Sequence, residues 1–297
     1  MNDKAEISDP AFALSDATVA IVGLGLMGGS LALALRARNA CKGILAVERD
    51  ADVCTRAIAR GVADQASADL SLASQADIIV LATPVRTIIA QLPQIGEHAR
   101  SGAMVIDLGS TKREITRAME ALPAHVQPIG GHPMCGKEVA GFNAADANLF
   151  RGAAFVLTPL ARTSPQTLAF AKSIVDVVGA RPLVLEPARH DKIVAATSHL
   201  PFVLAAMLMA TADDLARDDD LVFALAASGF RDTSRLAASD TAMMRDVLLT
   251  NRENVANAIR GCSHQLNEFA DLVAEGNGLA VRAMLANAAM RRRQLFK

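Results

Sequence analysis

The sequence predicts an α/β protein with a doubly wound parallel sheet, followed by an all-helical C-terminal region. Short, continuously apolar runs alternate with helix-forming segments between residues 18 and 185, which is typical of a parallel sheet covered by helices on both faces. A glycine-rich turn directly follows the first of these runs. Beyond residue 187 the strand patterns almost disappear, and Ala, Leu and Met dominate with spaced charges.

The strands are predicted from runs of β-branched and aliphatic residues. In chain order they are Thr18–Val22, Gly43–Val47, Ile78–Ala82, Met104–Asp107, Ala154–Thr158 and Leu183–Leu185. Helices are expected over residues 31–37 and 51–60, and another begins near Ser164, a good N-cap residue that precedes Pro165. The apolar stretch Leu200–Ala212 is too short to span a bilayer and is expected to be a buried helix. The predicted domains are therefore a polar tail (1–17), a sheet domain (18–188) and a helical domain (189–297).

Composition excludes several classes of protein. A chain of 297 residues with 52% hydrophobic residues is long enough for about two globular domains. A net charge of −1 and the absence of Trp and Tyr argue against a nucleic-acid or membrane-surface partner. Four scattered cysteines and a tail without a signal-peptide pattern indicate a cytoplasmic protein. No His, Cys, Asp and Glu have metal-ligand spacing, so no metal is expected.

A GxGxxG motif, Gly23 to Gly28, lies between the first strand and its helix. This context is the one a dinucleotide site requires, because the glycines allow a tight turn and a close approach of the backbone to a pyrophosphate. The predicted cofactor-binding residues of this turn are Gly23, Gly25, Leu26, Met27 and Gly28. The alternative is a glycine-rich turn without a ligand.

Four further residues are candidates for the same cofactor. Glu48 follows the second strand, 48 − 28 = 20 residues after the last glycine, where an acidic residue accepts the ribose hydroxyls. Its charge repels a 2′-phosphate and favours NAD, whereas the adjacent Arg49 leaves NADP open. Thr83 and Pro84 end the third strand, where either a cofactor contact or an ordinary turn fits.

The candidate chemical residues follow later strands. His132 lies in the segment Gly130–Gly136, interpreted as a loop, and His is suited to general-base chemistry near neutral pH. Ser110 either faces a nicotinamide or caps the next helix. His199 either lines the site or belongs to the core. The polar segment Ser228–Arg235, interpreted as a loop, is either solvent-exposed or a carboxylate site.

Together these motifs resemble the prephenate/arogenate dehydrogenase family of tyrosine biosynthesis. The matching segments are GLGLMGGS (23–30), ATP (82–84), DLGSTK (107–112), GGHPMCGKE (130–138), HD (190–191), SHLP (198–201) and SGFRDTSR (228–235). The resemblance implies a Rossmann domain followed by a helical domain that forms a homodimer, and an NAD- or NADP-dependent oxidative decarboxylation of prephenate or arogenate.

The resemblance also implies roles for individual residues. His132 would take the proton of the ring hydroxyl, and Ser110 would hydrogen-bond that hydroxyl. Arg235 would bind a substrate carboxylate, and Glu138 and Asp232 would lie around the site entrance.

The sequence departs from the family pattern at two positions, and other functions stay open. Phe202 replaces a second His that many prephenate-using members carry, and Met244 replaces a Trp. These departures leave the choice between prephenate and arogenate open. The alternatives are another hydride-transfer enzyme of the 6-phosphogluconate-dehydrogenase-like group, such as a β-hydroxyacid dehydrogenase or imine reductase, and a non-catalytic NAD-binding sensor.

Overall fold

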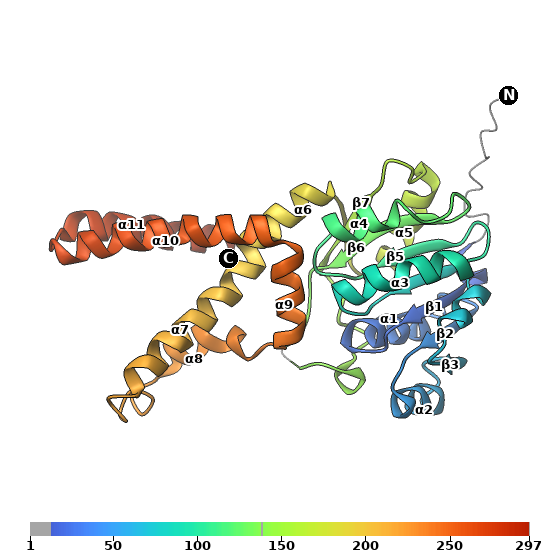
Figure 1. Ribbon diagram of the computed structural model, residues 1–297, viewed down its shortest axis with the longest axis horizontal. Coiled ribbons are helices and arrows are strands. Elements are labelled where there is room, and N and C mark those ends of the chain that lie inside the picture. Colours follow the sequence, from blue (N-terminus) through green and yellow to red (C-terminus); the bar gives the residue numbers. More distant parts are fainter. Residues whose placement is uncertain (1–12, 138, 297) are drawn as a thin grey trace. The chain divides into compact units, whose positions relative to one another are not determined.

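The computed structural model, which describes residues 13–137 and 139–296, contains an eight-stranded sheet (Figure 1). The strands are β1 (Thr18–Val22), β2 (Gly43–Val47), β3 (Gln65–Ser67), β4 (Ile78–Leu81), β5 (Met104–Asp107), β6 (Gln127–Pro133), β7 (Ala154–Pro159) and β8 (Arg181–Val184). Their order is β3-β2-β1-β4-β5-β6-β7-β8, and only the pair β6–β7 is antiparallel. The order reverses between β1 and β4, which makes the sheet doubly wound and confirms the predicted fold class.

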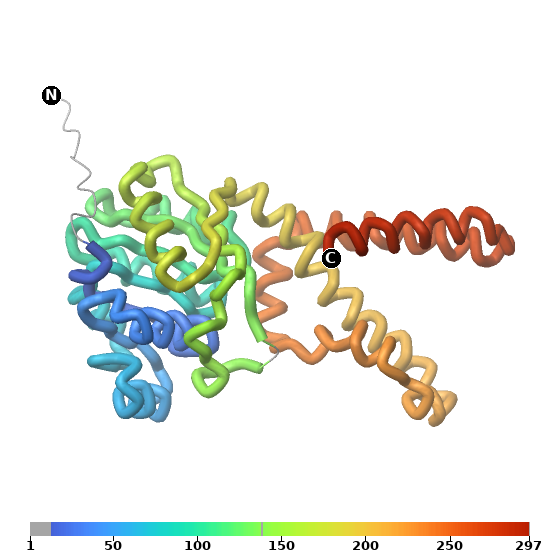
Figure 2. The backbone as a smooth tube through the Cα atoms, turned by 180° about the vertical axis from the view of Figure 1, so that it is seen from behind, coloured from blue at the N-terminus to red at the C-terminus, as the bar shows by residue number. Residues whose placement is uncertain are grey.

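Helices cover both faces of the sheet, as Figure 1 shows from one side and Figure 2 from behind. On one face lie α1 (Leu26–Ala37), α2 (Ala51–Ala59) and α5 (Pro165–Val177), and on the other lie α3 (Val85–His98) and α4 (Arg113–Met119). Each face has its own core of fully buried aliphatic side chains. Burial on both faces explains why the strands read as continuous apolar runs. Ser164 caps α5 through a bond to the Thr167 N–H, as its sequence predicts.

Two strands, β3 and β6, were not predicted from the sequence. The segment predicted as a loop around His132 is in fact the end of β6, so that prediction is wrong. Its glycines are required by close packing: a Cβ on Gly130 would lie 2.1 Å from Thr158 Oγ1, and one on Gly131 would lie 2.5 Å from the Asp107 carbonyl. Strand β6 therefore needs residues of low strand propensity because its neighbours leave no room for side chains.

After β8 the described chain is helical. The elements are α6 (Pro187–Val194), a π-helical turn (Ala195–His199), α7 (Leu200–Ala216), α8 (Ser228–Ser234), a 3₁₀ turn (Arg235–Ala238) and α9 (Thr241–Thr250). The first three form one 30-residue helix whose length and composition would allow it to cross a membrane. A single such helix is weak evidence, because the core helix of a soluble protein passes the same test. The prediction that residues 200–212 form a short, buried helix is wrong for the single chain, since only Ala205 of α7 is buried.

The chain divides into two compact units, the first ending at Asn251 and the second beginning at Arg252. The second unit consists of α10 (Arg252–Ala274) and α11 (Gly278–Leu295), which pack against each other. The domain boundary after residue 188 stays a prediction. Of the predicted tail, residues 1–12 lie outside the described part of the chain, and Leu14–Asp16 form a short 3₁₀ helix.

Candidate active site

The glycine-rich turn has the shape that a pyrophosphate requires. Gly23 has a φ of +92°, and a Cβ on Gly28 would lie 2.0 Å from the Gly23 carbonyl oxygen, so α1 packs directly on the turn. By contrast, no atom lies within 4 Å of the Cβ position of Gly25, where a phosphate would approach. The first N–H groups of α1, including those of Leu26 and Met27, have no partners within the helix, and they lie at the positive end of its dipole. These residues fit a dinucleotide cofactor.

Glu48 is placed beside this turn at the end of β2. One carboxylate oxygen accepts a hydrogen bond from the Leu24 N–H (2.8 Å) and the other from the Asp50 N–H (3.1 Å). The side chain is therefore held at the edge of the sheet where the ribose of a bound dinucleotide would lie. Arg49 is exposed next to it.

The turn after β4 borders the glycine-rich turn. Pro84 precedes α3, and the Thr83 hydroxyl donates to Gln91 Oε1 (2.8 Å). A Cβ on Gly23 would lie only 2.8 Å from the Thr83 methyl group, so the two turns are in contact. The predicted cofactor residues therefore come together at the carboxyl ends of β1, β2 and β4.

A cavity of about 340 Å³ lies at the ends of β5 and β6. Strand β6 contributes His132, the segment after β5 contributes Ser110, the π-helical turn contributes His199, and α9 contributes Met244. The other lining residues are Pro133, Met134, Cys135, Thr197, Ser198, Met243 and Val247. Ser110 is not a helix cap, since Lys112 occupies the N-cap position of α4. The structure therefore brings Ser110, His132 and His199 around one cavity.

His132 is the first member of a chain of hydrogen bonds. Its Nδ1 lies 2.8 Å from Nε2 of His190, and Nδ1 of His190 lies 2.8 Å from the Asp191 carboxylate. That carboxylate also accepts the backbone N–H groups of Lys112 (2.7 Å) and Arg113 (2.9 Å), at the start of α4. Burial, and secondarily the charges of His190, Lys112 and His199, hold the pKa of His132 well below its usual value. The imidazole is therefore neutral at neutral pH, as a general base must be.

His199 is held in a defined tautomer by Asn251. The Asn251 amide nitrogen donates to the carbonyl of Asp191 (2.7 Å), which identifies that atom as the donor. The same nitrogen lies 3.3 Å from His199 Nδ1, which must then accept, leaving the ring proton on Nε2. Burial lowers the pKa of His199 to about 4.

A buried ion pair supports the loop that carries Ser110. Lys112 Nζ bonds the Asp107 carboxylate and the Gly131 carbonyl, and neither charged side chain is exposed to solvent. The Asp107 carboxylate also accepts the N–H groups of Gly109 (2.7 Å) and Gly131 (3.1 Å). Desolvation raises the pKa of Asp107 and lowers that of Lys112. The pair joins β5, β6 and the loop between β5 and α4, and so sets Ser110 relative to His132.

Two of the remaining candidates do not line this cavity in the single chain. Residues 228–235, predicted as a loop, form α8 and the start of a 3₁₀ turn. Asp232 and Arg235 are exposed there and do not line the cavity. Glu138 lies outside the described residues.

Sequence reasoning missed the contributions of His190, Lys112 and Asn251. His190 and Asp191 match the HD segment of the family, but the resemblance assigns them no role. The His-Asp dipeptide in the first turns of α6 was the one local signal for it.

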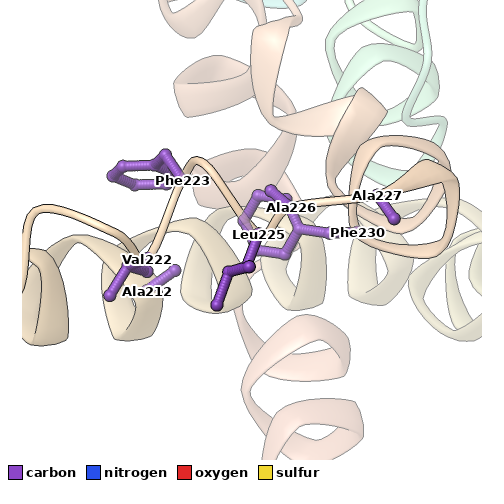
Figure 3. Close-up of a pocket in the computed structure, with 7 residues that line it drawn as sticks. All are labelled: Ala212, Val222, Phe223, Leu225, Ala226, Ala227 and Phe230. Atoms are coloured by element: carbon purple, nitrogen blue, oxygen red, sulfur yellow. The ribbon is translucent and has the colours of Figure 1, made fainter.

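A second cavity, of about 230 Å³, lies between the end of α7 and α8 (Figure 3). Every residue that lines it is apolar: Ala212, Val222, Phe223, Leu225, Ala226, Ala227 and Phe230. Phe223 and Phe230 are in edge-to-face contact, with ring centroids 6.3 Å apart. No titratable side chain lines this cavity, so we assign the chemistry to the cavity around His132.

The fold and this site define a class, the nicotinamide-dinucleotide-dependent oxidoreductases with a helical C-terminal domain. Residues 31–184 match the family model of the prephenate dehydrogenase nucleotide-binding domain, and residues 186–287 match that of the prephenate dehydrogenase dimerization domain. The chain belongs to the prephenate dehydrogenase family.

Three relatives illustrate the similarity. A prephenate dehydrogenase of Lactococcus lactis is 36% identical over 89% of this chain and 73% of its own length. A structure of prephenate dehydrogenase from A. aeolicus, in complex with hydroxyphenyl propionate and NAD⁺, has a TM-score of 0.89 at 30% identity, covering 96% of this chain and all of that one. Synechocystis arogenate dehydrogenase has a TM-score of 0.80 at 32% identity, covering 94% and 99%.

The burial of neutral His199 predicts a pH-dependent stability. Its folded pKa of about 4 lies below the usual 6.5, so the unfolded chain binds the proton first as the pH falls. The stabilisation is fully present above pH 6.5 and is lost toward pH 4, by about 3 kcal/mol. Urea unfolding of wild type and His199→Gln at pH 7.5 and pH 4.5 checks this: the variant should lose less stability between the two. Equal losses would contradict the assignment.

Proposed function

We propose that this protein catalyses the NAD(P)-dependent oxidative decarboxylation of prephenate or arogenate, a step of tyrosine biosynthesis. The observation that carries the proposal is His132, neutral and hydrogen-bonded through Nδ1, lining a cavity together with Ser110 in a chain of this family. The same sheet edge holds a glycine-rich turn that fits a dinucleotide.

The chain's own residues supply proton transfer and positioning. His132 accepts the proton of the ring hydroxyl as the carbon that bears it is oxidised to a carbonyl, and Ser110 hydrogen-bonds the same oxygen. The bound NAD(P)⁺ supplies the hydride acceptor. The electron pair left by the departing CO₂ completes an aromatic ring, and His132 returns its proton to the phenolic oxygen. The aromatisation makes the reaction effectively irreversible.

Substrate carboxylates need a cation to bind them. Among the described residues that line the cavity there is no Arg or Lys. We therefore assign carboxylate binding to Arg235, as its motif implies, because a guanidinium binds a carboxylate through two parallel hydrogen bonds. Glu138 and Asp232 belong to the site entrance in this proposal, and His199 presents its Nε2–H as a hydrogen-bond donor.

The first test is the formation of NADH or NADPH at 340 nm with prephenate and with arogenate. Wild type should turn over at least one of them, and His132→Asn should lower kcat by on the order of 10²–10⁴-fold, because it removes the general base. Cofactor binding, measured by calorimetry, should be unchanged. Absence of activity with both substrates would reject the proposed function, and an active His132→Asn would reject the role of His132.

The same assay decides between the two substrates. Activity on arogenate alone would indicate that the site around Phe202 accommodates the amino group of the substrate. Activity on prephenate would show that the second His of other members is dispensable.

We further propose that NAD is preferred over NADP. The carboxylate of Glu48 is fixed by the Leu24 and Asp50 N–H groups, and a 2′-phosphate beside it would be repelled. Glu48→Ser should raise the ratio of kcat/KM for NADP over NAD by at least about tenfold, the equivalent of about 1.4 kcal/mol. The matched control, Glu97→Ser, removes an exposed acid from the last turn of α3 and should leave the ratio near that of wild type. A wild type that already prefers NADP would contradict this.

We also propose that the protein is a cytoplasmic homodimer joined through its helical region, without a membrane or nucleic-acid partner. Residues 186–287 match a dimerization domain, and Leu204, Met207 and Leu215 of α7 are 40–61% exposed in the single chain. A second copy would bury this face. Light scattering at micromolar concentration should give about twice 31.1 kDa. A monomer, or sedimentation with phospholipid vesicles, would contradict the proposal.

A further inference from the structure

We propose that His190, held by Asp191, is a positioning residue that fixes the tautomer of His132 and leaves Nε2 of His132 as the proton-accepting atom. The inference rests on the proposed function and adds to it a residue outside the cavity wall. Three observations carry it: the hydrogen bonds from Asp191 to His132, the burial of His190, and the anchoring of Asp191 to α4.

The direction of each hydrogen bond follows from the Asp191 carboxylate. An ionised carboxylate only accepts, and this one takes the backbone N–H groups of Lys112 and Arg113 as well as the Nδ1–H of His190. Neutral His190 then has an unprotonated Nε2. That atom lies 2.8 Å from Nδ1 of His132, which must donate. His132 therefore has its proton on Nδ1 and a lone pair on Nε2.

The surrounding structure keeps both rings in this arrangement. His190 and Asp191 are each 1% exposed, in the first turns of α6. The two imidazoles meet edge to face, with centroids 5.0 Å apart and planes inclined by 72°. The Asp191 carbonyl is bonded to Asn251 as well, so the residue is held through both its backbone and its side chain. Neither ring can turn over without leaving a buried nitrogen without a hydrogen-bond partner, which is unfavourable.

The same chain of bonds helps His132 to hold the proton that it accepts. Burial disfavours the charged imidazolium form of His132, and the nearby Lys112 and His199 lower its pKa further. In the imidazolium the Nδ1 proton is shared with His190, and the charge is spread toward Asp191. The buried carboxylate thus offsets part of the cost of charging His132.

A proton on His190 has the opposite effect. Protonated at Nε2, His190 becomes a donor and forces Nδ1 of His132 to accept. The proton of His132 then lies on Nε2, and the base is lost. The position of His190 therefore requires a group that accepts a hydrogen bond from Nδ1 of His132.

The test compares His190→Gln with His190→Leu. The Gln amide oxygen can accept from Nδ1 of His132, whereas Leu fills the space without an acceptor. We expect His190→Gln to retain kcat within roughly tenfold of wild type and His190→Leu to lose about 10²-fold or more, with unchanged KM for the cofactor. His98→Gln, a replacement outside the site, should reproduce the wild-type kcat.

A second measurement needs no turnover. The chain has six histidines, so ¹⁵N-histidine NMR at neutral pH can report each tautomer. His132 should be protonated on Nδ1 in wild type and in His190→Gln, and should lose that preference in His190→Leu. Equal kcat in the Gln and Leu variants, or an Nε2-protonated His132 in wild type, would each overturn the inference. An inactive wild type with the expected tautomer would instead reject the substrate assignment alone.

Discussion

The carboxylate of Asp191 is the constraint on which the site depends. It accepts the first N–H groups of α4, where the helix dipole favours a negative charge, and it orients His190 and through it His132. The carbonyl of the same residue fixes Asn251, and Asn251 fixes His199. One residue at the start of the helical region thus determines the protonation sites of two histidines that line the cavity.

This arrangement requires polar groups to be buried, and the structure stabilises them in pairs. Asp107 and Lys112 are both inaccessible to solvent, and breaking such a pair by removing one partner typically costs about 3–5 kcal/mol. The pair joins two neighbouring strands to the loop that carries Ser110. Rigidity at the site therefore comes from hydrogen bonds that are satisfied inside the protein and cannot be exchanged for water.

The sequence predicted much of the sheet because its strands are buried on both faces and read as apolar runs. Strands β1, β2 and β5 begin and end where their patterns indicate. Strand β6 was missed because tertiary packing selects Gly130 and Gly131 against local propensity. Residues 228–235 were misread as a loop because local polarity resembles a turn, although they are helical in the structure. The apolar α7 was expected to be buried, but only Ala205 of it is buried in the single chain, because local composition does not determine which elements pack on a helix.

The sequence by itself determined the cofactor turn, the acidic residue 20 positions beyond it, and His132 as the candidate base, because each depends on residue type and local spacing. It could not determine which nitrogen of His132 is free, because that is set by His190, 58 residues away, and by Asp191 beside it. The buried pair of Asp107 and Lys112 and the tautomer of His199 likewise depend on groups brought together only by folding. The tertiary structure decided the protonation state of the site, because hydrogen-bond direction is a property of neighbours in space.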